Sequence, residues 1–217
     1  MMDKRGRNQL LPAAIALFCL VSFLFFDQPL TLFFHQLDTG LWHRVWEAIT
    51  RAGQSEWYLA GGLLLYAGFR KRNRQISVKG LFLFSTVAAS GLTSDLFKII
   101  LCRARPTLFL QQGIYGFDLF GWHFDHTWQS FPSGHSTTAL SAALSLSLLF
   151  PRFRPAFIIA GVVIAASRVV LCQHYLSDIV AGSALGVATV ALLYRRFFPP
   201  VAGDKPRLPM LSFDHSP

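Results

Sequence analysis

Six apolar runs separated by short polar segments dominate the hydropathy pattern of the chain. They cover residues 10–26, 57–69, 80–102, 134–150, 156–171 and 179–198. A helix that crosses a membrane needs about 20 predominantly apolar residues, and the runs reach or approach that length with their flanking residues. The pattern predicts an all-α bundle of six membrane-spanning helices in one domain, 1–198, followed by a disordered tail, 199–217. The first run is interpreted as a retained helix, because no Ala-x-Ala cleavage site follows it.

The polar segment between the first two runs has a helical pattern of its own. Asp38 and Thr39 suit the start of a helix, and Gly53 suits its end. The apolar side chains between them share one face: Leu41, Trp42, Val45, Trp46 and Ile49. The segment is predicted to be an amphipathic helix in the outer membrane interface, with ordinary packing on the bundle as the alternative. The aromatic-rich segment 107–131 is interpreted as a loop that enters the lipid headgroups or caps the bundle.

The composition supports a membrane protein and excludes a typical soluble domain. Hydrophobic residues make up 53% of the chain and charged residues 14%, whereas a soluble domain carries about 25% charged residues. The net charge of +9 indicates anionic lipid headgroups rather than nucleic acid, because the basic residues lie beside apolar runs. The three cysteines form neither a disulfide framework nor a metal motif, and a bridge between Cys102 and Cys172 is disfavoured.

The positions of the lysines and arginines predict the orientation of the chain. Most of the 20 lie in the termini and loops that a six-span layout with both ends inside places in the cytoplasm. This distribution obeys the positive-inside rule. The remaining ones are Arg44, Arg51, Lys98, Arg103, Arg105 and Arg168. The candidate site is therefore expected on the outer side of a membrane, and the short chain without glycosylation acceptors in its outward loops favours a bacterial inner membrane.

The end of the third run carries two cations at helical spacing. Lys98 and Arg105 are seven residues apart, so both point the same way if the helix continues. The helix is expected to end at Arg105, because Pro106 disfavours helical geometry in the residue before it. Lys98 lies deep enough to need a partner, for which Asp95 is the nearest candidate. Arg103 is expected to extend to the membrane surface instead.

The fourth run opens with the sequence Pro-Ser-Gly-His. Ser133 suits a helix N-cap and Gly134 permits close approach of a ligand to the backbone. The free N–H groups and the helix dipole favour an anion there. His135, at the edge of this site, is placed to donate a proton to a leaving group.

The fifth and sixth runs are joined by a segment that contains Arg168, His174 and Asp178. On a helix, the histidine and the aspartate four residues later share one face. A carboxylate near an imidazole fixes its tautomer and leaves the other ring nitrogen ready to attack. The alternative is an interfacial helix cap with both side chains satisfied by water. With three cations and no metal-ligand spacing, the combined pattern predicts a phosphate site.

Together these segments resemble the three-part signature of the type-2 phosphatidic acid phosphatase family, which shares its site with vanadium haloperoxidases and acid phosphatases. The motifs are Lys98-x6-Arg105-Pro106, Pro132-Ser133-Gly134-His135 and Ser167-Arg168-x5-His174-x3-Asp178. The resemblance implies that His174 attacks phosphorus, that Asp178 orients its ring, and that His135 protonates the leaving oxygen and then activates water. It further implies that the phosphoryl oxygens are held by Lys98, Arg105, Arg168, Ser133 and the Gly134 amide. No metal or other cofactor is implied.

The expected activity is hydrolysis of a membrane lipid phosphate or diphosphate through a phosphohistidine. The candidate substrates are undecaprenyl diphosphate, phosphatidylglycerophosphate, phosphatidate and a lipid A phosphate. A lipid phosphotransferase would use the same site, and a non-enzymatic lipid-binding or transport protein is the alternative from another class. A transporter is expected to show internal repeats and polar residues at mid-membrane, which this sequence lacks apart from Asp95. The sequence indicates no nucleic-acid partner and no particular oligomeric state.

Overall fold

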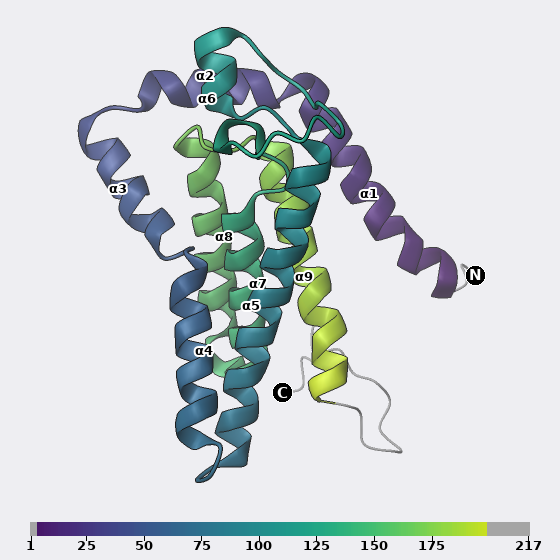
Figure 1. Cartoon of the computed structure of the whole chain (residues 1–217), viewed down its shortest axis with the longest axis vertical. Helices are drawn as coiled ribbons and strands as arrows, with labels where there is room; N and C mark the ends of the chain where they lie inside the picture. Colours follow the sequence, from purple (N-terminus) through teal and green to yellow (C-terminus); the bar gives the residue numbers. More distant parts are fainter. Residues whose placement is uncertain (1–3, 199–217) are drawn as a thin grey trace, which may run out of the picture.

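The computed structural model describes residues 4–198, which form a bundle of helices with a layer of short elements across one end (Figure 1). The long elements of the bundle are α4 (Ser55–Phe69), α5 (Arg74–Leu101), α7 (Gly134–Leu149), α8 (Arg154–Val170) and α9 (Leu176–Phe197). Helix α7 packs against α5, α8 and α9, so it forms the centre. Apart from an isolated bridge between Arg103 and Phe117, the described residues contain no β pairing, which confirms the all-α fold class.

Small side chains allow α7 to occupy the centre of the bundle. Its sequence is mostly Ser, Thr, Ala and Leu, and every side chain from Ser136 to Ser145 is buried. Gly182 and Gly186 of α9 face it four residues apart, where a Cβ atom would lie 2.5 Å from the Ser133 carbonyl oxygen and 2.4 Å from that of Thr137. Membrane helices that approach so closely need small residues at the contact. This close contact fixes the position of the N-terminus of α7 relative to α9.

The N-terminal part of the chain surrounds one end of the bundle. Helix α1 (Lys4–Phe25) packs on α9 and then bends by 62° into α2 (Asp27–Leu37), which crosses that end (Figure 1). Helix α3 (Gly40–Arg51) packs against α8 and leads into α4. The predicted helix at 38–53 is confirmed by α3. Helix α2 had not been predicted, because it begins where the apolar run 10–26 ends.

The remaining elements lie in the connections. Helix α6 (Pro106–Gln112) and the 3-10 turn η1 (His126–Trp128) lie almost entirely in the segment 107–131, which was predicted to be a loop. The 3-10 turn η2 (Pro151–Phe153) precedes α8. Pro106 occupies the first turn of α6, where its missing N–H costs nothing. The predicted end of the third long helix at Arg105 is wrong, because α5 already ends at Leu101 and Cys102 follows it in a left-handed conformation (φ 41°). Pro106 therefore starts α6 but does not end α5.

The six-span count remains a prediction. Within residues 4–198, three helical stretches are long and apolar enough to cross a membrane, Arg74–Leu101, Pro151–Val170 and Leu176–Phe197, and the bent pair of α1 and α2 would make a fourth. Helices α4 and α7 have only 15 and 16 residues, so their apolar runs are shorter than a usual span. The predicted tail, 199–217, lies outside the described residues.

Candidate active site

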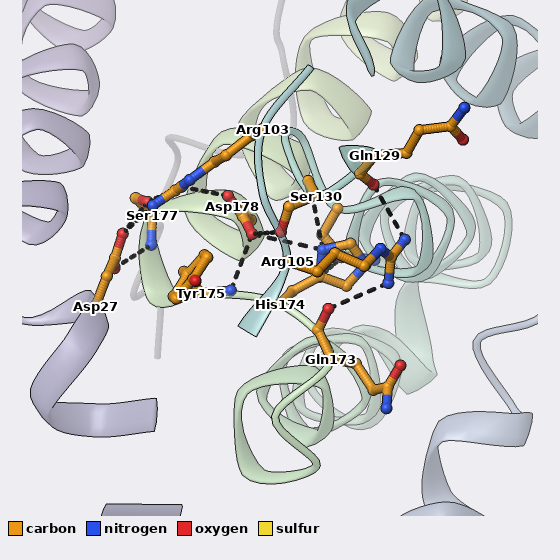
Figure 2. A network of polar contacts seen from close by, with 12 residues as sticks. Asp27, Arg103, Arg105, Gln129, Ser130, Gln173, His174, Tyr175, Ser177 and Asp178 are labelled. Atoms are coloured by element: carbon orange, nitrogen blue, oxygen red, sulfur yellow. Dashed lines mark hydrogen bonds and ion pairs between the residues drawn. The ribbon is translucent and has the colours of Figure 1, made fainter. Parts of the chain in front are cut away.

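The three sequence motifs converge at the end of the bundle where α7 begins. Arg105 donates hydrogen bonds to the carbonyl of Gln173, beside His174, and to that of Gln129 (Figure 2). The Ser133 amide donates to the carbonyl oxygen of Asp178 at 3.1 Å. The eight residues predicted for the site are therefore brought together, although they come from α5, the connection after it, the N-cap and first turn of α7, α8, the connection that follows it, and α9.

The first turn of α7 has the geometry expected of an anion site. The Ser133 hydroxyl caps the helix, accepting hydrogen bonds from the amide of Ser136 at 3.4 Å and from its hydroxyl at 2.9 Å. A Cβ atom at Gly134 would lie 3.0 Å from the Lys98 ammonium nitrogen, so the missing side chain lets the lysine approach the helix. Lys98 also pairs with Asp95 at 2.8 Å, which confirms the predicted partner.

The His174 ring is buried, and its orientation is fixed by the backbone of another segment. Its Nδ1 lies 2.8 Å from the carbonyl oxygen of Ser130 (Figure 2). A carbonyl only accepts hydrogen bonds, so Nδ1 carries the proton and Nε2 carries the lone pair. Burial, followed by the charges of Arg105, Arg168 and Lys98, lowers the pKa of His174 well below its usual value. The imidazole is thus neutral and nucleophilic at neutral pH.

Asp178 acts on His174 largely through Ser130. Its Oδ2 is 3.5 Å from the His174 Nδ1, which is farther than the Ser130 carbonyl. The same oxygen accepts hydrogen bonds from the Ser130 hydroxyl at 2.5 Å and from the Tyr175 amide at 2.9 Å (Figure 2). The carboxylate therefore anchors the residue that holds the ring, an intermediary for which the sequence contains no signal.

The prediction that Arg103 reaches the membrane surface is wrong, because its side chain is completely buried. The guanidinium pairs with Asp178 and, at 2.7 Å, with Asp27 (Figure 2). Its central carbon lies 4.4 Å from the ring centroid of Tyr175 and 5.0 Å from that of Phe117, so aromatic faces contribute cation–π attraction. Burial alone would lower the pKa of Arg103, but Asp178 and Asp27 reverse the effect and raise it.

Asp27, which sequence reasoning missed, completes this buried network from the bend between α1 and α2. It accepts hydrogen bonds from the Ser177 amide at 3.0 Å and from the Ser22 hydroxyl at 2.7 Å, besides the one from Arg103. A signal was present, because a carboxylate directly after an apolar run requires a partner if it is buried. The network ties the N-terminal helices to Asp178, the residue that anchors Ser130 against His174.

Arg105 and Arg168, like Arg103, retain a buried Nε donor without a hydrogen-bond partner among residues 4–198. Arg168 donates to the Thr50 hydroxyl of α3 at 3.0 Å, a contact that the sequence did not predict. Burial lowers the pKa of Arg105 to about 10, so it remains protonated at neutral pH. Buried guanidinium donors of this kind match the oxygens of a phosphoryl group.

Comparison with known proteins gives the family. The model of the PAP2 superfamily matches residues 79–200, a range that contains all eight predicted site residues. The chain belongs to the PAP2 superfamily. The resemblance inferred from the three motifs is thus confirmed.

Two similar curated proteins carry the name lipid A 1-phosphatase. The protein from Rhizobium etli is 39% identical over 152 residues, which cover 64% of this chain and 65% of that protein. The protein from Rhizobium johnstonii is 36% identical over 179 residues, which cover 77% and 71%. The match thus spans slightly less than two thirds of the length of the first relative.

A solved structure supports the fold. The PAP2-type phosphatidylglycerolphosphate phosphatase from Bacillus subtilis, a transmembrane protein, superposes with a TM-score of 0.61 over 86% of this chain and 94% of its own, at 22% identity. At that identity the similarity concerns the fold alone. The shared fold is all-α, and the apolar helices of this PAP2 protein that are long enough to cross a membrane indicate a membrane protein. Its three cysteines are free, and the disfavoured Cys102–Cys172 bridge is not formed.

Proposed function

We propose that this PAP2 protein is a lipid phosphatase that works through a phosphohistidine and needs no metal ion. The observation that carries the proposal is the buried His174, whose Nδ1–H is bound by the Ser130 carbonyl so that the Nε2 lone pair is available. Lys98, Arg105 and Arg168 supply the positive charge that a phosphoryl group requires in its transition state.

The reaction has two displacement steps. In the first, the Nε2 lone pair of His174 forms a bond to phosphorus, the bond to the leaving oxygen breaks, and His135 donates a proton to that oxygen. In the second, His135 takes a proton from water, the water oxygen bonds to phosphorus, and the N–P bond breaks to release phosphate. His174 is regenerated with its proton still on Nδ1.

The proposed substrate is the glycosyl phosphate of a lipid A-type molecule, which the names of the two relatives support. The distribution of basic residues supports a location in a bacterial inner membrane, with both termini cytoplasmic and the site on the outer side. Phosphatidylglycerophosphate, phosphatidate and undecaprenyl diphosphate belong in the same substrate panel.

The test is phosphate release from that panel by the purified protein in EDTA, with His174→Ala beside it. Wild-type activity in chelator and its loss in the variant are expected. His35→Ala, which removes an exposed imidazole on α2, is the matched control and should retain activity. Activity that disappears with EDTA, or that survives His174→Ala, would overturn the mechanism, and transfer of phosphate to a second lipid would identify a phosphotransferase instead.

A further inference from the structure

A cavity of about 300 Å³ adjoins the candidate site on the side of α3. His135, Arg168 and Gln173 line it from the site, and residues of α3 and the turn that follows it line the other wall. This volume is at the lower end of the range of about 300–1,000 Å³ for small-molecule sites.

The cavity is next to the group that must meet the leaving oxygen. Attacking and leaving atoms lie roughly in line on opposite sides of phosphorus, so the leaving group lies away from His174 and against His135. His135 contributes to the wall of the cavity, and Gly53 brings the end of α3 close to its ring, since a Cβ atom at Gly53 would lie 3.6 Å from it. The leaving group of a bound phosphate ester is therefore directed toward α3.

The amphipathic pattern of α3 supports this role. His43, Glu47 and Thr50 lie on one face of the helix, and Gln54 continues that side after its end; all four line the cavity. Of the apolar side chains of α3, Leu41 and Val45 are exposed by 70% and 47%, whereas Ile49 packs against the core. His43 and Glu47 line an open cavity, so their side chains are also 46% exposed. A helix that only floats in the interface would turn its polar face to water, whereas here the polar face is turned toward the phosphate site.

We propose that the polar face of α3 is the leaving-group site and that it binds the hydroxyl groups of a sugar phosphate headgroup. This proposal rests on the proposed function and names the part of the substrate that α3 selects. The Glu47 carboxylate accepts hydrogen bonds from hydroxyl groups, and the amides of Gln54 and Gln173 both donate and accept. The exposed apolar face of α3 would lie against lipid.

The experiment compares two substrates on the full-length protein, lipid A 1-phosphate and 4-nitrophenyl phosphate, whose leaving group has no aliphatic hydroxyl. The variant combines Glu47→Ala with Gln54→Ala, and Glu56→Ala on α4, an exposed carboxylate outside the cavity, is the matched control. The double variant is expected to lower kcat/KM for the sugar lipid by about tenfold or more, because a site built for hydroxyl groups loses its partners. Its kcat/KM for the aryl phosphate should stay within about twofold.

The outcomes separate the two proposals. A double variant that loses activity on the sugar lipid alone supports the leaving-group site, and retained turnover of 4-nitrophenyl phosphate shows that it is folded. A double variant that leaves both activities unchanged, or lowers both equally, overturns the role of α3 while leaving the phosphatase proposal intact. The phosphatase proposal itself would be refuted if the wild-type protein hydrolysed neither substrate, or if the His174→Ala variant still hydrolysed both.

Discussion

Replacing Arg103 by methionine tests the buried network most directly. Met fills a similar volume without charge, so the substitution leaves the carboxylates of Asp27 and Asp178 without their shared cation. Both carboxylates are fully buried, with side chains 0% exposed. Removing one partner of a buried ion pair costs about 3–5 kcal/mol, whereas loss of an exposed arginine that only pairs at the surface costs about 0–1 kcal/mol. We therefore expect Arg103→Met to lower the free energy of unfolding by about 3–5 kcal/mol.

The assay is equilibrium unfolding of the purified protein in detergent micelles, followed by helical circular dichroism. Arg44→Met, which removes an exposed arginine from α3, is the matched control and should change the unfolding free energy by less than about 0.5 kcal/mol. Phosphatase activity should fall with the Arg103 variant, because Asp178 would no longer be held against Ser130. An unfolding free energy within about 1 kcal/mol of wild type would refute the reasoning and restore the surface position that the sequence had predicted.

Three further outcomes are expected. Burial holds the pKa of His174 well below its usual value in the folded protein, and unfolding restores it to about 6.5. The unfolded state therefore binds more protons below that pH, so the unfolding free energy should fall as the pH drops below about 6.5. Melting at a series of pH values should show a smaller dependence of stability on pH in His174→Gln than in wild type, and an equal dependence in both proteins would contradict the low pKa. Gly186→Ala should destabilise the bundle by about 1–3 kcal/mol through overpacking against α7, whereas Gly91→Ala, where a Cβ atom meets nothing within 4 Å, should not; equal melting temperatures would argue against the close contact. His135→Gln should lower kcat/KM for a sugar phosphate by about 10²–10⁴-fold but lower kcat/KM for 4-nitrophenyl phosphate much less, because kcat/KM covers the step in which the leaving group departs and nitrophenolate leaves without a proton. Loss of the base in the second step should lower kcat on both substrates, whereas an equal loss of kcat/KM on both would remove the acid role.

Helix positions and site motifs could be predicted because both depend on neighbouring residues. The run 179–198 is apolar, Ser133 caps α7 by accepting from the amide of Ser136, and Lys98 pairs with Asp95 within one helical turn. Each of these features is set by helical periodicity. The same periodicity identified the two faces of α3, although not which of them would line a cavity.

The contacts that support the site could not be predicted, because they join residues far apart in the chain. Arg103 and Asp27 are 76 residues apart and Arg168 and Thr50 are 118 apart. The bend of 62° after Phe25 brings Asp27 to the network, and the apolar pattern of α1 does not encode it. Arg103 also looked like an ordinary interfacial arginine, since its sequence neighbours contain no carboxylate.

The position of Asp27 at the bend between α1 and α2 has a consequence for the biogenesis of this protein. During synthesis Asp27 emerges 150 residues before its partner Ser177. Arg103 likewise emerges 75 residues before its partner Asp178. Until α9 is inserted, Arg103 has only Asp27 as a carboxylate partner within this network. Helix α9 therefore completes the hydrogen-bond network that begins at Asp27, so a nascent chain that stops before α9 presents quality-control proteases with an unfinished core rather than a slightly shortened enzyme.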